Sequence, residues 1–517
     1  MKQRITYVVT DPESFNPEQI DVQKGSNGKS DTFTLTRVRA AKEHRITLGL
    51  DELSEAPIDI EVLKKWHELH VRWAPDIPEL AAVPFTSRVS PGLHIFFTPS
   101  TEAKDPDLCH DVRSVFHSVD RRFKCTTSNE TAIKMPMLSE RFTMSTALEY
   151  YSPFTEDDWS ASEIAVWFQR MTGEMSTPAY VDIDYDAISQ AVICTAVWSS
   201  GPRIGWTDQF AVPEDDSTVE IGVLSHESNT DPEDYQFGGF LTVLGRDDKP
   251  KPTRFQTPAR HYPILTADPF NPNTTPKPSP LRFRTSINRP TGLHPTLTLT
   301  FPTEHLTAPD PTCKLHTHLT LPSALFIDKH QFSDALFLAS KNLLALRSLS
   351  GATDLEAPDW VIPQWGSSSL FELATPPADA STPDWTVSIP LHLRYSPAAP
   401  ASHDTLHVPW PVVFWACRAD EGEKHPLNPF DRRHLGYEAL FGPKTRFMHV
   451  QPVSERGADG ALKRLVETID VPVLDTRQVG WVEGGTVGIV LVAFLGLCWV
   501  LFGRIGGTKE EAEKKKQ

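Results

Sequence analysis

The chain has 517 residues, of which 39% are hydrophobic and 13 are tryptophan, a composition that predicts packed domains and excludes a disordered chain. A formal net charge of −17, with no basic run in the body, excludes a nucleic-acid-binding surface. The 45 prolines outnumber the 27 glycines. Because proline donates no backbone hydrogen bond, this disfavours long helices and predicts a mainly β protein of short strands and stiff loops.

The first 246 residues predict a mixed α/β, β-rich region. TFTLTRV and HRITLGL alternate as strands do, and GLHIFFTP reads as a strand that ends at a proline. Residues 180–198 read as a second strand pair or as one buried strand with a polar lead. In EVLKKWHELHVRW, Val62, Trp66, Leu69 and Trp73 recur at helical spacing and predict one short amphipathic helix.

Composition changes after this region. Residues 247–280 are so rich in proline that we expect a linker or a long surface excursion. Short β-branched or aromatic segments then follow between turn residues, from HPTLTLTF to RFMHVQP, and predict an antiparallel β-sandwich over residues 281–452. Residues 453–483 are expected to form a juxtamembrane segment.

Residues 484–503, GGTVGIVLVAFLGLCWVLFG, predict one C-terminal transmembrane helix. At about 1.5 Å per residue this stretch spans roughly 30 Å, the thickness of the hydrocarbon core of a bilayer. The tail, 504–517, carries five Lys or Arg, whereas 469–483 carries only Arg477. Positive charge favours the cytoplasmic side, so the tail is expected in the cytosol and the large N-terminal body in a lumen.

Three further signals concern the compartment. Lys514 and Lys515 stand fourth and third from the end, as in a coat-recognised signal for retrieval to the endoplasmic reticulum (ER), although a merely basic terminus would look the same. Asn129 and Asn273 begin N-x-T glycosylation patterns. No cleavable signal peptide is visible in the first 15 residues, a feature that a cytosolic tail-anchored protein would share.

Five of the six cysteines lie outside the membrane helix, so at least one thiol is expected to be free unless an intermolecular bond forms. Cys109 and Cys125 would close a short loop and are the easiest pair to form; the other pairings stay open.

Two constellations could hold a metal ion. Asp182 and Asp184 end an apolar strand as an Asp-x-Asp pair, the arrangement with which many glycosyltransferases hold a divalent cation, but acids at alternate positions are equally typical of a strand with a solvated face. His316 and His318 follow Cys313 on one strand face but lack a fourth zinc ligand. With no GxSxG, P-loop, GxGxxG or HExxH motif either, we expect no catalytic, cofactor or metal residues.

The stretch LHLRYSPAAPASHDTLHVPWPVVFWAC, 391–417, concentrates histidines without a fixed spacing. His392 and Arg394 alternate with apolar residues and share one face, a proline-broken loop follows, and the second apolar run enters the core. The pattern predicts a β-hairpin.

In this stretch, HLRYSPAAP followed by LHVPWPVVFWAC resembles the signature of the PIG-X family, the accessory subunit of glycosylphosphatidylinositol (GPI) mannosyltransferase I. LPSALFIDKHQF is similar to the segment upstream of it. QRITYVV, WHELHVRW and SRVSPGLHIFFTP resemble the longer fungal members, known as protease B non-derepressible proteins. The PIG-X-like part covers roughly 281–452, and the fungal pieces extend the resemblance over most of the chain.

The resemblance implies a single-pass ER membrane glycoprotein with a lumenal body and no catalytic residues. Its implied partners are membrane lipid and the catalytic PIG-M-type subunit, which adds the first mannose of the GPI core from dolichol-phosphate-mannose; it also implies a role in folding other secretory proteins. His392 and Arg394 then become candidate partner contacts. The alternatives are a single-pass metal-dependent glycosyltransferase that uses Asp182 and Asp184, and a general ER chaperone.

Overall fold

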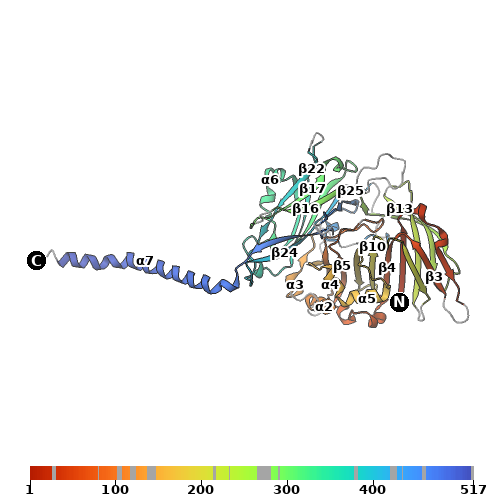
Figure 1. Ribbon diagram of the computed structural model, residues 1–517, viewed down its shortest axis with the longest axis horizontal. Helices are drawn as coiled ribbons and strands as arrows, with labels where there is room; N and C mark the ends of the chain where they lie inside the picture. The colour runs from red at the N-terminus through yellow and green to blue at the C-terminus, as the bar shows by residue number, and fades with distance from the viewer. Residues whose placement is uncertain are drawn as a thin grey trace.

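The N-terminal half is built on one mixed sheet of eleven strands in the order β14-β13-β12-β1-β4-β10-β9-β5-β6-β8-β7 (Figure 1). The computed structural model describes the chain except residues 26–30, 80, 102–106, 117–123, 137–146, 213–216, 232, 265–280, 289–291, 378–381, 420–427, 433–434, 457–461 and 514–517. Inside the sheet, β1 pairs in parallel with β12 and antiparallel with β4. The strands are β1 (Lys2–Val9), β4 (Ala40–Gly49), β5 (Trp66–Ala74), β6 (Gly92–Pro99), β7 (Ile133–Lys134), β8 (Leu148–Ser152), β9 (Tyr180–Asp186), β10 (Ala191–Trp198), β12 (Thr218–Glu227), β13 (Asp234–Val243) and β14 (Lys251–Pro258).

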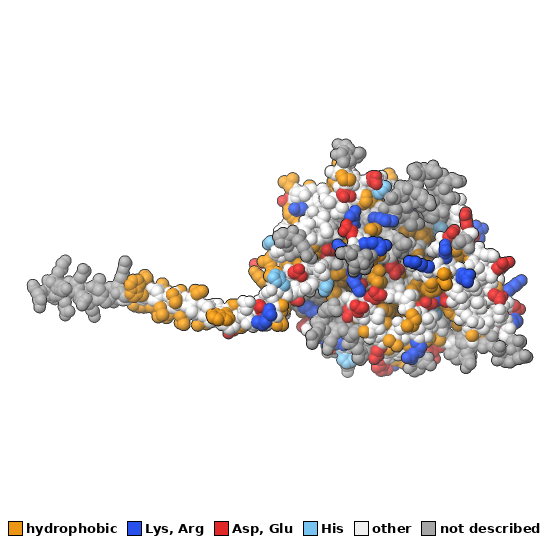
Figure 2. Space-filling view, in the orientation of Figure 1, with side chains coloured by type: hydrophobic (Ala, Val, Ile, Leu, Met, Phe, Trp, Pro, Cys, Tyr) orange, Lys and Arg blue, Asp and Glu red, His pale blue; other side chains and the backbone are white. Residues whose placement is uncertain are grey.

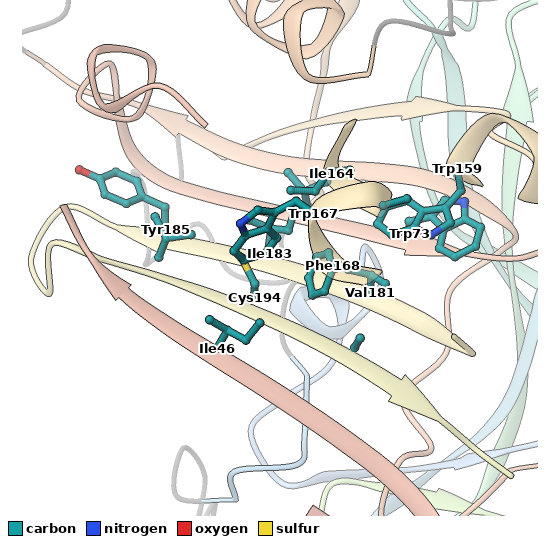
Figure 3. Packing of buried hydrophobic residues seen from close by; sticks show 14 of the residues in the cluster. Ile46, Trp73, Trp159, Ile164, Trp167, Phe168, Val181, Ile183, Tyr185 and Cys194 are labelled. Atoms are coloured by element: carbon teal, nitrogen blue, oxygen red, sulfur yellow. The ribbon is translucent and has the colours of Figure 1, made fainter. Parts of the chain in front are cut away.

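One face of this sheet is covered by a three-stranded sheet and by helices. The small sheet has the order β11-β3-β2, and Trp206 of β11 meets Tyr7 of β1 edge to face. Trp159 stacks on Trp73 of β5 with ring centroids 4.5 Å apart (Figure 3). The covering elements are β2 (Ile20–Gln23), β3 (Thr32–Val38), β11 (Trp206–Ala211), α1 (Ile60–Leu63), α2 (Leu108–Val115), α3 (Ser128–Thr131), α4 (Glu156–Ser160) and α5 (Glu163–Thr172).

The ends and the buried face of helix α5, which covers the large sheet, follow from its local sequence. The Ser162 hydroxyl accepts a hydrogen bond from the backbone N–H of Ala165 and so satisfies one of the free donors at the helix start. Gly173 ends the helix with a φ of 72°, a conformation that glycine adopts without steric cost. Ile164, Trp167 and Phe168, spaced along one face, are buried against the sheet (Figure 3).

The C-terminal half is a β-sandwich, which confirms the predicted fold class. A six-stranded sheet, β15-β26-β25-β18-β21-β20, faces a four-stranded sheet, β22-β17-β16-β27, across a core of leucine, valine, isoleucine and aromatic side chains. Its elements are β15 (His261–Pro263), β16 (Arg282–Ile287), β17 (Thr296–Pro302), β18 (Lys314–Pro322), β19 (Leu325–Phe326), β20 (Leu343–Gly351), β21 (Gly366–Leu373), β22 (Asp384–Pro390), β23 (His392–Leu393), β24 (His403–Pro409), β25 (Val412–Arg418), β26 (Thr445–His449), β27 (Gln451–Pro452), β28 (Val466–Pro472) and α6 (Ala335–Ser340).

The two sheets of the sandwich differ in burial. The four-stranded sheet has one exposed face, so β16, Arg-Phe-Arg-Thr-Ser-Ile, alternates strictly between exposed and buried residues. In the six-stranded sheet β18 and β21 are buried on both faces. The second face, with Leu370, Phe414 and Phe447, packs with Tyr437 and Val89 in a separate cluster that joins the two halves.

The predicted helix over Val62 to Trp73 is wrong: α1 ends at Leu63, and Trp66–Ala74 is strand β5. A β-bulge between Trp66 and Glu68 shifts the alternation of the strand by one residue. Trp66 therefore lies in the same core as Val71 and Trp73, and the resulting spacing imitates a helical period.

The expected segment boundaries need two corrections. Within the predicted linker 247–280, β14 pairs with β13 in the first sheet, and β15 pairs in parallel with β26 in the second. Within the expected juxtamembrane segment 453–483, β28 pairs antiparallel with β24 over seven positions. Both segments thus contribute strands to the body.

The predicted hairpin over 391–417 is also wrong. Strand β23 pairs with β19, β24 pairs with β28, and β25 lies between β18 and β26. Trp410 and Pro411 separate β24 from β25, and Pro411, like Pro409 at the end of β24, cannot donate to a ladder between the two strands. Each strand therefore joins a different sheet.

The predicted C-terminal apolar helix is confirmed as α7 (Val479–Glu513), which projects away from the body (Figure 1). Among the described residues, one segment is long and apolar enough to cross a membrane, the 27 residues Thr476–Phe502, and none of its most apolar window is buried inside the protein. Hydrophobic side chains lie along the visible face of this part of the helix (Figure 2).

Candidate functional site

The two halves of the chain are joined by a buried ionic cluster on the face of the large sheet that the helices leave open. Arg432, from the C-terminal half, places Nη2 2.7 Å from Oε2 of Glu43 and Nε 2.8 Å from Oδ2 of Asp182. All three side chains are buried. Arg45 of β4 also donates a hydrogen bond of 2.6 Å to the backbone oxygen of Pro429. Ion pairs to Arg432 and a hydrogen bond to the Pro429 backbone thus hold segment 428–432 against the sheet.

Asp182 and Asp184, the candidate cation ligands, are engaged by protein cations. Asp182 is fully buried, and Arg72, directly opposite it on β5, approaches Oδ1 at 3.6 Å in addition to the Arg432 contact. Asp184 forms an ion pair with His70, its cross-strand neighbour. A carboxylate that already faces two guanidinium groups in the interior is poorly suited to hold a divalent cation, so the geometry favours a structural role.

The electrostatics of His70 show how strongly this site is charged. Burial alone would lower the pKa of His70, but the negative charge and hydrogen bond of Asp184, with a further contribution from Asp182, reverse the effect and raise it. The two carboxylates therefore favour the protonated form of the imidazole.

A second buried group lies where β8 meets the C-terminal half. Glu149 is fully buried, and neither carboxyl oxygen has a hydrogen-bond partner among the described residues. Burial raises the pKa of Glu149 to about 8. The Nε1 of Trp365 donates a 2.9 Å hydrogen bond to the Glu149 backbone oxygen, so the strand is fixed to the other half while its carboxyl stays without a counter-charge in the described part of the chain.

Gly436 provides the space for this contact. Its φ is 90°, in the region that favours glycine, and a Cβ there would lie 3.3 Å from Cε1 of His318 and 3.7 Å from Oε1 of Glu149. The glycine therefore allows side chains from both halves to approach one segment of backbone.

Histidines in this contact are held neutral. Burial and then the nearby His94 lower the pKa of His318 to about 3, while its Nε2 is 2.9 Å from the Ser368 hydroxyl. Burial lowers the pKa of His94 to about 4, against the opposing effect of a 2.8 Å hydrogen bond to the Ser90 backbone oxygen. These neutral rings fill the interior between the two halves. Each ring makes a hydrogen bond to a neighbouring serine, and the two are not arranged as a proton relay.

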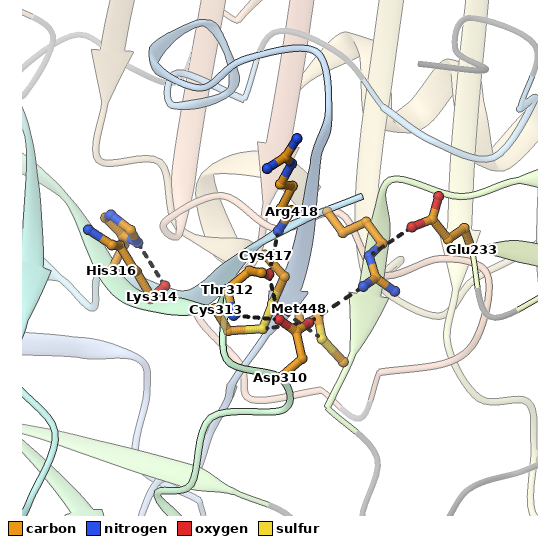
Figure 4. Close-up of a disulfide and its surroundings, with 10 residues drawn as sticks. Glu233, Asp310, Thr312, Cys313, Lys314, His316, Cys417, Arg418 and Met448 are labelled. Carbon is orange, nitrogen blue, oxygen red and sulfur yellow. Dashed lines mark hydrogen bonds and ion pairs between the residues drawn. A yellow bond between two sulfur atoms is a disulfide. The ribbon is translucent and has the colours of Figure 1, made fainter. Parts of the chain in front are cut away.

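The Cys313, His316 and His318 constellation does not form a metal site. His316 contacts the Lys314 backbone oxygen through Nδ1 at 2.9 Å and stacks on Phe414. Among the described residues, the group of three possible ligands that lie close together is Asp310, Cys313 and Cys417, but the two sulfurs are bonded to each other as a disulfide (Figure 4).

The second disulfide joins Cys109 and Cys125, the pair that sequence separation favours. Cys194, in the middle of β10, is a buried free thiol whose pKa is raised by burial and then by the charge of Asp184. Two disulfides in the body are typical of an oxidising compartment.

His392 and Arg394 share one face, as predicted, because both contact the ring of Phe326. Arg394 is buried, with 2% of its surface exposed, and donates hydrogen bonds to the backbone oxygens of Ser323, Ala357 and Ala352. This corrects the expectation that Arg394 contacts a partner. Its guanidinium is buried and hydrogen-bonded to backbone oxygens of the protein itself, so it is not accessible to another protein. His392 is half-buried, and its Nδ1 lies 3.1 Å from that of His294.

Of the other predicted site residues, Asn129 is exposed on α3, beside the buried Thr131. Asn273, Lys514 and Lys515 lie outside the described residues. Arg432 and Glu149 were not predicted from sequence. Arg432 belongs to no motif, and Glu43 lies 389 positions away, so no local pattern connects them.

An apolar helix long enough to cross a membrane, continuous with a β-sandwich, defines the class: a mainly β protein with one candidate membrane span among the described residues. The sequence profile of the PIG-X / PBN1 family matches residues 290–502, the stretch that holds most of the sandwich together with the helix. Protein pbn1 of Aspergillus oryzae is 39% identical over all of this chain and 99% of its own length, and protein pbn1 of Aspergillus fumigatus is 40% identical over 97% of this chain and 94% of its own. The chain belongs to the PIG-X / PBN1 family.

More distant relatives align over less of the chain: protein PBN1 of Saccharomyces cerevisiae is 30% identical over 45% of this chain and 47% of its own length. Among solved structures, the C-terminal domain of the Streptococcus agalactiae polypeptide BspA covers 80% of this chain and 95% of its own, but at 8% identity and a TM-score of 0.10 it carries no argument about the fold.

Proposed function

We propose that this chain is a non-catalytic ER membrane subunit that stabilises the catalytic subunit of GPI mannosyltransferase I, the enzyme that adds the first mannose of the GPI anchor. The observation that carries the proposal is the extent of the family match, 290–502, which takes in the sandwich and the membrane helix together. A partner with several membrane spans and lumenal loops would be contacted by both parts.

The ionic cluster supports an accessory role over a metal-dependent glycosyltransferase. Asp182, the buried member of the Asp-x-Asp pair, already forms ion pairs with Arg432 and Arg72. In the proposed arrangement the large sheet is a scaffold, and the surfaces of the sandwich and helix carry the function.

The membrane helix offers a surface for a neighbouring helix. A side-chain carbon added at Gly484, Gly485, Gly488 or Gly496 would meet no other described part of the protein within 4 Å, apart from the helix's own backbone, so these small surfaces are open to the bilayer. Small residues let helix backbones approach closely. In the proposed topology the body is lumenal, and the cytosolic tail carries the retrieval lysines Lys514 and Lys515. Asn129 and Asn273 are glycosylated in this arrangement.

The same proposal divides the chain into an N-terminal scaffold, a sandwich, a membrane helix over 484–503 and a tail over 504–517. The boundary of 1–246 is moved past β14, because that strand completes the first sheet.

The test is depletion of this protein in a fungal cell that carries a tagged catalytic subunit. We expect the catalytic subunit and GPI-anchored proteins to fall together, and crosslinking to recover this one mannosyltransferase. Unchanged levels of the subunit, or many unrelated crosslinked clients, would contradict the proposal; the second outcome would indicate a general chaperone.

An Asp184→Asn variant separates the accessory role from catalysis. Asp184 is half exposed, so its replacement leaves the Arg432 cluster intact. We expect mannose transfer to be unchanged. Transfer lost while both proteins remain at normal levels would identify this chain as the enzyme.

A further inference from the structure

A group of exposed apolar side chains is linked by hydrogen bonds to the point where the chain enters the candidate membrane helix. We call it the apolar rim. Trp360 and Val361 are 58% and 59% exposed, and Tyr395 is 67% exposed. The other members are Leu293, Leu355 and Leu474.

Hydrogen bonds hold the rim together as one surface. The backbone N–H of Asp359 donates to the Tyr395 backbone oxygen at 3.0 Å, which fixes the loop with Trp360 and Val361 beside Tyr395. Arg394 fixes the same loop through the Ala357 backbone oxygen at 2.9 Å. Leu293 is joined to this framework by a 2.9 Å hydrogen bond from the Leu393 N–H to its backbone oxygen.

The rim is also tied to the membrane anchor. The loop that begins at Tyr395 reaches Ala399, whose N–H donates to the Leu474 backbone oxygen at 3.1 Å and whose oxygen accepts from Thr476 at 2.9 Å. Thr476 is the first residue of the candidate membrane span. Four residues of extended chain reach roughly 14 Å at most, so Tyr395 lies within that distance of the point of entry.

Beside the start of the candidate membrane span, the rim has the side-chain types that are typical of a membrane interface. Tryptophan and tyrosine are favoured at the headgroup level, where the ring is shielded and its polar atom stays hydrated. Trp481, 87% exposed on the first turns of α7, has the same position on the helix itself. Asp354 and Glu356 beside the rim disfavour an anionic lipid surface.

We propose that the apolar rim inserts into the headgroup region of a zwitterionic bilayer and holds the body against the membrane surface. The bilayer is preferred to a protein partner as the occupant because hydrogen bonds tie the rim to Leu474 and Thr476 at the start of the candidate membrane span. The contact adds a second membrane attachment beside the helix.

The test uses the full chain in phosphatidylcholine nanodiscs, with an environment-sensitive fluorophore on Glu356→Cys. This exposed residue lies within the rim, and its replacement leaves every rim side chain in place. The matched control is Ile204→Cys, an exposed position next to Gly205, which packs on Arg37 of β3. Strand β3 lies at the end of the body remote from α7 (Figure 1).

Quenching by nitroxide-labelled lipid should be several-fold stronger for the label at 356 than at 204, and quenching by aqueous iodide should be weaker. Adding Trp360→Ser and Tyr395→Ser, both at exposed positions, should reduce the lipid quenching at 356 by at least half. Equal lipid quenching at 356 and 204 would overturn the proposal. A label at 356 shielded from both quenchers would do so too, since protein would then cover the rim.

Discussion

Arg432 lies 2.7 Å from Glu43, a residue 389 positions earlier in the chain, and both are buried at the contact between the two halves. The same guanidinium reaches Asp182 at 2.8 Å. One arginine therefore contacts two carboxylates of the large sheet, and its removal would leave both without this partner in the protein interior.

We expect Arg432→Met to lower the free energy of unfolding by about 3–5 kcal/mol, because breaking a buried ion pair leaves uncompensated charge. Chemical unfolding of the detergent-solubilised protein measures this. The matched control is Arg284→Met, which breaks an exposed pair with Glu455 and should cost at most about 1 kcal/mol. Equal losses in the two variants would show that the buried pair does not hold the halves together.

Glu149→Gln should stabilise the protein at neutral pH. The pKa of the buried carboxyl is raised from 4.5 to about 8, so the folded protein keeps a proton that the unfolded chain releases. Stability is therefore lost as pH rises from 4.5 towards 8, and at pH 7 the variant should gain about 3 kcal/mol. The gain should vanish below pH 4.5. A gain that does not depend on pH would contradict a charge effect, and the exposed Glu455→Gln serves as the control.

His318 should make the protein sensitive to acid. Its pKa falls from 6.5 to about 3 on folding, so its neutral form contributes fully above pH 6.5, and that contribution is lost as pH falls towards 3. Between pH 7 and pH 5, His318→Gln should lose about 2 kcal/mol less stability than the parent protein. The exposed His403→Gln should follow the parent. Parallel pH profiles for all three proteins would disprove the assignment.

The two disulfides should differ in their effect on stability. Cys313 and Cys417 are 104 positions apart, and Cys109 and Cys125 are 16 apart. A longer closed loop restricts the unfolded chain more, so removing the first bond should cost roughly 4–5 kcal/mol and removing the second roughly 3. Urea unfolding of the two double-serine variants measures the difference, and the reverse order would contradict the loop-length argument.

Glycosidase treatment should increase the gel mobility of the protein from fungal membranes if the body is lumenal. The shift should shrink in Asn129→Gln and disappear when Asn273→Gln is added. A shift that persists in the double variant would point to other acceptor sites, and the absence of a shift in the parent protein would contradict a glycosylated lumenal body.

Strands with one solvated face were predictable from the sequence because alternation marks them. HPTLTLTF contains β17, where each second residue is buried. Strand β5 was mistaken for a helix because Trp66 falls outside the strand-like alternation of Val71 and Trp73 with His70 and Arg72. The bulge at Trp66 completes the false period.

The candidate site was less predictable than the fold. The tertiary partner of Asp182 comes from the far half of the chain, and its cross-strand partner Arg72 depends on a register that sequence does not give. The family signature at 391–417 was recognised from sequence, but the pairing of its strands was not. The partner of β24 is β28, which lies far along the chain, shortly before the candidate membrane helix.

Because β1 lies inside the sheet, one of its edges stays unpaired during translation until a distant strand has been synthesised. Strand β1 ends at Val9, and β12, one of its two neighbours, begins at Thr218. At ribosomal speeds of about 5–20 residues per second, the first strand waits roughly 10–40 s with an open edge. The last strand of the sheet, β14, ends at Pro258, and Arg432 emerges later still, so Glu43 and Asp182 wait for their arginine partner after the sheet itself is complete.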